Sequence, residues 1–521
     1  DYYADIVVDN FTLIMILIAG VIGSLIAVFS LGYMEAFQKE HRDVRDRRNF
    51  FFFVLFLFLS AMFGLVVSNN LLYMYTFWEI TSVCSFLLIG YTESRVAVNN
   101  SFKALWMNLL GGAAFAAAII VMGLTYHSTA LSHLVGLALA GMPVTVILAL
   151  LLLCGFTKSA MMPFSGWLLG AMVAPTPTSA LLHSSTMVKA GVFLIIKLCP
   201  ALGNNHAGTM AMFVGGITFF FASCAAISQS DGKKVLAYST ISNLGLIVCC
   251  AGIGSYEAAW TAIMIVIFHA VAKSLLFLSV GTAEQQLGSR DIERFDGLFN
   301  AMPHLCLCMV IGISGMFLAP FGMLISKWAA MKAFIDAGHP MLLLLLVFGS
   351  ATTIFYWAKW LGKILSVMNG QERREQGITK GEWFTLKTLS WMTIIVCILF
   401  PLISSYGVLP YLRITYGFTR DVIAQSNLII MSLMVVLLVI LPSRYGKGQP
   451  KRKVGALLAG VNTGDDRNYR GAGDNIIPVE LRNWYMEEWF GEKKMKLSGF
   501  ALCMACIFIQ FAIILGGVYR G

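Results

Sequence analysis

Long apolar runs dominate this sequence and constrain its fold more than any other feature. About fourteen of them are long enough, at roughly 20 residues each, to cross the hydrocarbon core of a bilayer as helices. Of the 521 residues, 58% are hydrophobic and only 12% are charged. A spanning segment must pair its backbone polar groups internally, and these runs are too long for barrel strands, so we predict an all-α polytopic membrane protein. The expected spans lie near 10–34, 49–68, 70–92, 101–126, 143–174, 177–199, 206–230, 234–254, 256–281, 301–337, 341–367, 385–408, 426–442 and 496–517.

Charge and cysteine usage limit the classes of partner and cofactor. The net charge of +10 lies in short loops between apolar runs, so we expect no nucleic-acid partner. The basic loops fall on one side of the helix arrangement, which the positive-inside rule makes cytoplasmic. Cys503 and Cys506, the nearest approach to a metal spacing, lie in the last apolar run, so we expect no metal site. Since no Walker loop or dinucleotide fingerprint occurs, we also expect no cofactor in this chain.

Two apolar segments, near 143–174 and 301–337, are too long to be plain spans. The first contains Pro163 and the second contains Pro320, so we expect each to be a helix broken inside the membrane. Each is the fourth helix of a consecutive group of five, 49–199 and 206–367, and an odd number of helices reverses the direction of the second group. This pattern predicts two inverted repeats, each forming a half-channel, with a site near the bilayer midplane.

The regions outside these repeats are simpler. We expect an N-terminal helix and a basic cytoplasmic loop over 1–48, two additional spans over 385–442 and a C-terminal span over 496–517. Residues 443–495 are rich in Gly, Lys, Arg, Asp and Asn and predict a polar cytoplasmic linker, with 477–490 as a candidate amphipathic surface helix. The chain begins with Asp rather than Met, so we expect an N-terminal piece to be missing.

Ionisable residues within the apolar runs are the candidate functional residues. A charge at the bilayer centre costs about 3 kcal/mol or more, so it needs a partner, an aqueous cavity or a function. Lys158 and Lys327 lie beside the two expected helix breaks. Glu79 lies in the middle of another span, and we expect it to pair with Lys158 and to control when this lysine holds its proton. The alternatives are a structural ion pair between two helices and, for Lys327, a side chain that reaches toward the interface.

Two histidines and two more lysines extend this set. His183 and Lys189 share a predicted helix, and His269 and Lys273 are spaced to lie on one helix face. Histidine titrates near neutral pH, which suits a proton relay between lysines. The alternatives are helix–helix hydrogen bonds for the histidines and an interfacial position for Lys189. Ionisable residues in at least about five apolar helices are difficult to explain by packing alone.

Four strings carry a resemblance to a known family: TFWEITSVCSFLLIGY, GFTKSAMMPFSGWLLGAMVAPTPTSALLHSSTMVKAGVFLI, KKVLAYSTISNLGL and FHAVAKSLLFL. They closely resemble the proton-pumping antiporter-like subunits of respiratory complex I, whose relatives include Mrp cation/proton antiporters and energy-converting hydrogenases. The resemblance covers roughly residues 5–370. It implies that Glu79 is the family's glutamate and Lys158 its partner lysine, with bridging, central and terminal positions at His183, Lys273 and Lys327. Lys189 resembles a lysine of the Mrp and hydrogenase relatives.

The sequence also departs from this family. Leu109 and Gly112 stand where some distal complex I subunits have Arg and Asp, and Ile265 stands where a second histidine can occur. The shorter strings SGMFLAPFGMLISKWAA and GVNTGDDRNY most resemble the subunit of group 4 membrane-bound nickel-iron hydrogenases, of the Ech or formate-hydrogenlyase type.

The resemblance implies an ion-translocating subunit of a redox-driven complex in the cytoplasmic (inner) membrane of a prokaryote. Its expected partners are other membrane subunits and a peripheral cytoplasmic redox arm, and nickel-iron and iron-sulfur centres are expected in those partners. A complex I subunit and an Mrp-type sodium/proton antiporter remain the alternatives, and the coupling ion remains open between proton and sodium.

Overall fold

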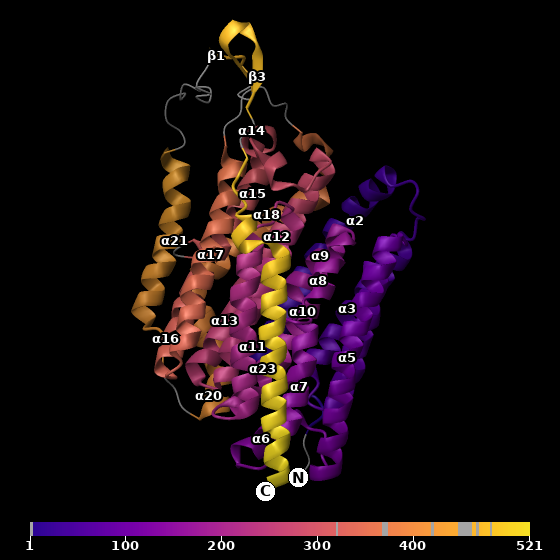
Figure 1. Cartoon of the computed structure of the whole chain (residues 1–521), viewed down its shortest axis with the longest axis vertical. Coiled ribbons are helices and arrows are strands. Elements are labelled where there is room, and N and C mark those ends of the chain that lie inside the picture. Colours follow the sequence, from indigo (N-terminus) through magenta and orange to yellow (C-terminus); the bar gives the residue numbers. More distant parts are fainter. Residues whose placement is uncertain are drawn as a thin grey trace.

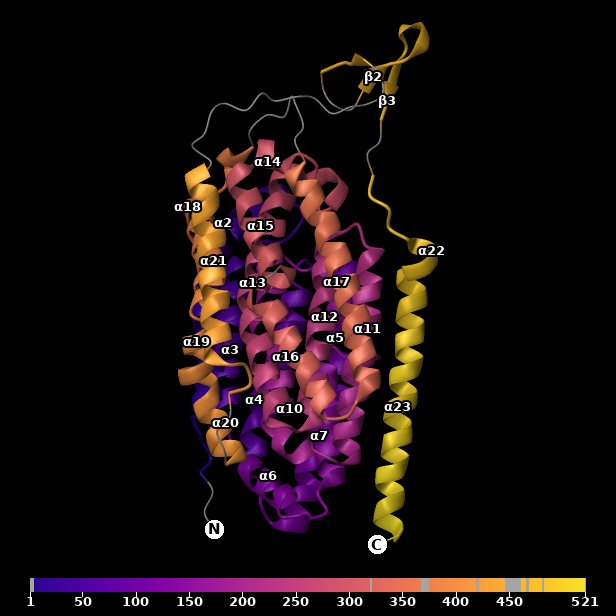
Figure 2. The same ribbon diagram turned by 90° about the vertical axis from the view of Figure 1, so that its left-hand side faces the viewer.

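The chain folds into a bundle of long helices that run nearly parallel to one axis (Figures 1 and 2). The computed structural model describes residues 4–318, 321–366, 374–417, 421–445, 461–464, 468–479 and 482–520. Within these residues, 11 helices are long and apolar enough to cross a membrane, or up to 12 if the bent pair Lys380–Ile398 and Phe400–Tyr416 counts as one span. The all-α membrane fold is thus confirmed, whereas the expected number of about fourteen spans is not. Two expected spans correspond to shorter apolar helices, Thr145–Lys158 and Gln425–Leu438.

The first half of the chain contains helices α1 to α10. Several are separated only by short π or 3-10 turns. Their bounds are α1 Asn10–Leu17, η1 Ile18–Ile22, α2 Gly23–Glu40, α3 Arg48–Val67, α4 Leu71–Ile89, α5 Arg95–Tyr126, α6 Leu131–Leu139, α7 Thr145–Lys158, α8 Gly166–Gly170, η2 Ala171–Val173, α9 Thr176–Ala180, η3 Leu181–Ser185 and α10 Met187–Leu202.

The second half adds the most deeply buried helices. Their bounds are α11 His206–Ile227, α12 Gly232–Ile253, α13 Tyr256–Leu287, η4 Ile292–Phe295, α14 Leu298–Ala301, α15 Pro303–Phe317, α16 Gly322–Asp336, α17 Pro340–Leu365, η5 Glu375–Gly377, α18 Lys380–Ile398, α19 Phe400–Leu402, η6 Ile403–Val408, α20 Leu409–Tyr416 and α21 Gln425–Tyr445. The apolar 18-residue stretches of α12 and α13 are completely buried inside the structure, so these two helices form the centre of the bundle.

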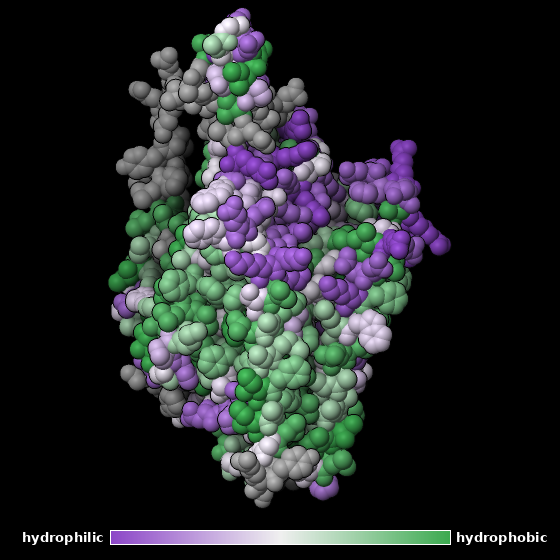
Figure 3. Space-filling view, viewed as in Figure 1, coloured by the Kyte–Doolittle hydropathy of each residue, from purple (hydrophilic) through white to green (hydrophobic). Residues whose placement is uncertain are grey.

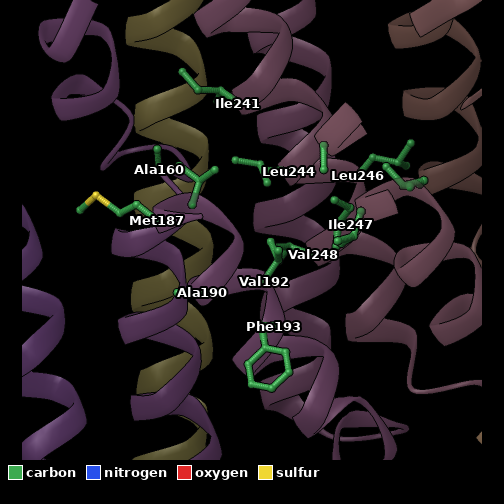
Figure 4. Close-up of a cluster of buried hydrophobic side chains, with 14 of the residues drawn as sticks. Ala160, Met187, Ala190, Val192, Phe193, Ile241, Leu244, Leu246, Ile247 and Val248 are labelled. Carbon is green, nitrogen blue, oxygen red and sulfur yellow. The ribbon is translucent and has the colours of Figure 1, made fainter. Parts of the chain in front are cut away.

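Local sequence signals explain where many of these helices begin and end. Asp231 and Ser255 cap the first turns of α12 and α13 by accepting hydrogen bonds from Lys234 N and Ala258 N. Gly254 and Gly288 end the same helices in the left-handed conformation, which glycine adopts without steric cost. Helices α10 and α12 both contribute to an apolar core, and buried side chains from the two helices, among them Val192, Ile241 and Leu244, are labelled in Figure 4.

The polar linker differs from expectation. It contains a three-stranded antiparallel sheet, β1 Val461–Asn462, β2 Asn468–Arg470 and β3 Ile476–Pro478, which projects from one end of the bundle (Figure 2). The candidate surface helix over 477–490 is wrong for the described part of this segment, because β3 occupies its start and only α22, Glu487–Phe490, is helical. The final helix, α23 Glu492–Arg520, then lies along α11, where Gly499 permits close contact with Met162 and Phe221.

The surface is divided into polar and apolar zones. Hydrophilic residues gather at the end that carries the sheet, α14 and the tip of α2, and a broad hydrophobic belt covers the helices below them (Figure 3). Several of the ion pairs lie at the hydrophilic end, among them Lys233 with Glu284 at 2.7 Å and Arg290 with Asp231 at 2.7 Å. A belt of this kind is what a lipid environment requires, which places the chain within a membrane.

Candidate functional site

The first helix break positions Lys158. Helix α7 ends at Lys158, and α8 begins only at Gly166, after a cis peptide bond between Met162 and Pro163. Such a break exposes carbonyl and amide groups that the helix no longer pairs. Here Trp167 Nε1 donates to Thr157 O at 2.9 Å, and Met162 N donates to Thr218 Oγ1 at 3.1 Å. The break is therefore fixed by neighbouring helices, and it holds Lys158 at a helix end within the buried interior.

Lys158 is fully buried and rests on helix α4. Its Nζ donates to Ser82 Oγ at 2.7 Å and to Trp78 O at 3.0 Å, and it lies 4.9 Å from the centre of the Trp78 ring. Each partner is uncharged. The direct ion pair with Glu79 that the sequence suggested is not among the ion pairs of the described residues. Glu79 Oε1 is buried without a hydrogen-bond partner in the described structure, and it lies against Gly112 of α5.

Lys273 in α13 has almost the same surroundings in the second half. It is fully buried, and its Nζ donates to Leu236 O at 3.1 Å and to Ser239 Oγ, both on α12. The ring of Trp357, on α17, lies 5.0 Å from its Nζ. In both halves a buried ammonium thus rests on a backbone carbonyl, a serine hydroxyl and a tryptophan face. These neutral acceptors stabilise the charged form without fixing it in a strong ion pair.

Lys189 and His269 join the two halves. Lys189 lies in α10 and His269 in α13, both are fully buried, and Lys189 Nζ is 3.0 Å from His269 Nδ1. A second polar contact lies beside them, because Ser274 Oγ donates to Ser184 Oγ at 2.7 Å. His269 and Lys273 share α13 as the spacing suggested. A proton can pass between a lysine and a histidine at hydrogen-bond distance, so this contact is a direct bridge between the halves.

His183 occupies an irregular stretch of the same span. It belongs to the π-helical turn η3, and the following Thr186 departs from helical geometry. Its ring is fully buried, 6.0 Å from the ring of Trp167 and 5.9 Å from that of Phe277. Within the described structure both of its ring nitrogens are buried without a hydrogen-bond partner. π-turns of this kind are frequent at functional sites, because they redirect a side chain from the regular helix surface.

Lys327 lies in α16, the helix that follows the second break. Helix α15 ends at Phe317 and α16 begins at Gly322, so a break separates them, while Pro320 itself falls outside the described residues. Lys327 is 6% exposed and lies 5.7 Å from the ring of Phe219 in α11. It thus sits in the bundle rather than at its surface.

The sequence alone did not identify the groups that accept hydrogen bonds from Lys158 and Lys273. Ser82 and Ser239 carry no signal of their own in an apolar helix, and a backbone carbonyl has none at all. Only the position of Ser82 three residues after Glu79, on the same face of α4, could have suggested its role.

Among the described residues no group of three or more His, Cys, Asp or Glu could hold a metal ion, and Cys503 packs against Val214 and Thr218 of α11.

Comparison with protein families gives two matches. Residues 68–353 match the transmembrane family described as NADH:quinone oxidoreductase/Mrp antiporter, and residues 2–51 match the N-terminal family of chain 5 of NADH-ubiquinone oxidoreductase (complex I). The first match covers every predicted site residue from Glu79 to Lys327.

Individual relatives agree with this assignment. Na(+)/H(+) antiporter subunit A1 of Staphylococcus aureus strain JH9 is 33% identical over 398 residues, which is 71% of this chain and 49% of that protein. This chain therefore spans about half the length of the curated relatives it matches. The Mrp complex from Dietzia sp. DQ12-45-1b contains a chain with 27% identity and a TM-score of 0.71, covering 85% of this chain and 50% of that one. The archaeal membrane-bound sulfane sulfur reductase has a similar fold, with a TM-score of 0.69, 22% identity and 83% and 85% coverage.

Proposed function

Because this chain belongs to the NADH:quinone oxidoreductase/Mrp antiporter transmembrane family, we propose that it moves protons or sodium ions across a membrane. The observation that carries the proposal is the buried set of Lys158, Lys189, His269 and Lys273, each of which is 0% exposed. Burying this many ionisable groups is costly, and a structural anchor does not require it.

The arrangement supports a relay. Lys158 and Lys273 each hold a proton on neutral acceptors, so a modest change in nearby charge can favour its release. Glu79 is a charge that acts on Lys158, and its carboxylate oxygen without a hydrogen-bond partner in the described structure makes it a candidate switch that approaches Lys158 in another state. The contact between Lys189 and His269 would then pass a proton from one half to the other. Polar atoms of Ser159, Thr178 and His183 have no hydrogen-bond partner among the described residues, which supports an interior polar enough to carry a hydrated path.

Two kinds of assembly can use this chain. We favour a cation/proton antiporter of the Mrp type, because the 33% identical relative is a Na(+)/H(+) antiporter subunit and the Dietzia structure is an Mrp complex. The second candidate is a membrane-bound nickel-iron hydrogenase, favoured by the strings around Pro320 and Asn462, with nickel-iron and iron-sulfur centres in its partner subunits. In both we propose a prokaryotic inner membrane, cytoplasmic basic loops and two inverted repeats over 49–199 and 206–367.

Vesicles that contain the purified complex can test the function and separate the two assemblies. A sodium gradient alone should drive proton movement in an antiporter, whereas a hydrogenase should require an electron donor. Lys273→Ala should abolish proton movement in either assembly, while Lys332→Ala should not, because Lys332 pairs with Asp336 on the exposed face of α16. Normal proton movement by the Lys273→Ala complex would contradict the proposed function.

A further inference from the structure

A second lysine of α10, which is largely but not fully buried, lies outside the relay described above. Lys197 follows Lys189 by eight positions, which separates them by about 12 Å along the helix axis. Its Nζ forms an ion pair with Asp9 Oδ2, and it donates to Thr12 Oγ1 at 3.2 Å. The side chains of Lys197 and Asp9 are only 14% and 23% exposed. The N-terminus and α20 lie at the end of the bundle opposite the sheet (Figure 2), and Asp9 is close to the N-terminus in sequence while Lys197 contacts Tyr411 of α20.

Three aromatic rings from three helices surround the Lys197 ammonium. The ring centres of Phe11 in α1, Phe193 in α10 and Tyr411 in α20 lie 5.8, 5.3 and 5.3 Å from Nζ. Phe11 also contacts the other two rings, at centroid distances of 5.2 and 5.5 Å. An aromatic ring attracts a cation to its face by its quadrupole. The site is therefore a cage built for a cation, and the lysine is the cation that fills it in this structure.

The carboxylate of Asp9 does not depend on Lys197 for its position. Asp9 caps α1, and its Oδ1 accepts a hydrogen bond from Thr12 N at 2.8 Å. If the ammonium moves away, the second carboxylate oxygen and the Thr12 hydroxyl remain in place. Carboxylate and hydroxyl oxygens are ligands that hard metal cations prefer.

We propose that this cage is an exchange site for a monovalent metal cation, with Na⁺ as the ligand class, and that the cation displaces the Lys197 ammonium. The cation binds the Asp9 carboxylate, Lys197 releases its proton to water and becomes a neutral amine, and the charge of the site is unchanged. One cation thus replaces one proton. The proposal deepens the antiporter function and rests on it. The competing explanation is an ion pair that only fastens α1 and α20 to α10.

Binding of Na⁺ to the purified complex, followed by calorimetry between pH 6 and pH 9, tests this site. In the unmodified complex, affinity should rise with pH, because protonated Lys197 competes with the metal. Lys197→Gln should raise the affinity by at least about tenfold at neutral pH and remove the pH dependence, since the competing charge is gone. Asp9→Asn should abolish this binding. Among the described residues, the titratable groups that face the pair include Tyr411 of α20, which interacts with Asp9 and with Cys199 of α10. Tyr416 of α20 and Glu257 of α13 interact with this group in turn.

Asp336→Asn is the matched control. It removes the carboxylate of the exposed ion pair between Asp336 and Lys332, and it should leave the Na⁺ affinity unchanged. Equal Na⁺ affinity in the unmodified, Lys197→Gln and Asp9→Asn complexes would overturn the exchange site and leave the fastening role. Equal Na⁺ affinities would leave the proposed function unaffected. The proposed function is contradicted instead if Lys273→Ala complexes still move protons.

Discussion

Replacing Lys158 by methionine should separate ion movement from stability. Methionine has a similar length but cannot hold a proton or donate hydrogen bonds. The substitution removes two hydrogen bonds, of 2.7 and 3.0 Å, each worth about 1.5–3 kcal/mol to a charged group. It also removes a contact with the Trp78 ring worth about 1–2 kcal/mol.

The substitution also removes the cost of burying the ammonium charge, and this gain in stability is of similar size. A fully buried ammonium carries a desolvation cost of several kcal/mol, which methionine abolishes. Ser82 Oγ keeps its hydrogen bond to Trp78 O at 3.1 Å, so no buried hydroxyl is left without a partner. We therefore expect the free energy of unfolding to change by less than about 2 kcal/mol, while proton movement is lost.

Thermal unfolding in detergent and proton uptake by vesicles, measured on one preparation, check this prediction. Ser82→Ala provides the comparison, because it keeps the ammonium and removes one acceptor, which should cost about 1–3 kcal/mol. Two results would refute the reasoning. One is proton uptake at the normal rate in Lys158→Met, and the other is a change in its free energy of unfolding well above about 2 kcal/mol.

Two further perturbations test other contacts. Gly112→Ala places a methyl group where the Glu79 carboxylate lies, so proton movement should fall severalfold, whereas Gly123→Ala, in open space on the same helix, should have no effect. Tyr485→Phe removes the Tyr485 hydroxyl's hydrogen bond to Glu293, at about 1–2 kcal/mol, and should increase hydrogen exchange in residues 482–486. Although burial raises the pKa of Glu293, hydrogen bonds from a lysine and Tyr485 hold it below its usual range. The Tyr485–Glu293 contact should therefore persist above the ordinary glutamate pKa near about 4.3 and weaken as pH falls below it. If the protection of residues 482–486 against hydrogen exchange at about pH 3 equals that at neutral pH, this reasoning is contradicted.

Hydrophobicity made the spans predictable, because the bilayer sets both their length and their composition. It also located the ionisable residues, since a lysine in an apolar run is conspicuous in any sequence. The end of α7 at Lys158 agrees with the sequence as well, because Pro163 limits how far a helix can continue.

Contacts between distant segments could not be predicted in this way. Glu79 and Lys158 were expected to pair because opposite charges are the obvious partners, yet Ser82 and the Trp78 carbonyl lie closer to Nζ. The contact between Lys189 and His269 depends on how α10 and α13 pack, which no local pattern encodes. Strands of two or three residues, as in the linker sheet, are too short to show an alternating pattern.

The use of backbone carbonyls as lysine acceptors has a consequence for mutational scanning. Any residue placed at Trp78 or Leu236 still supplies the same carbonyl oxygen, so side-chain substitution leaves half of each lysine's hydrogen bonding intact. Scans of α12 will therefore score Leu236 by packing alone, and scans of α4 will score Trp78 by packing and by its ring contact with Lys158, so both will under-report the part that the two carbonyls play in holding the ammonium. Replacing the amide by an ester would weaken the carbonyl as an acceptor without altering the side chain, and it would expose a contribution that genetic variation cannot reach.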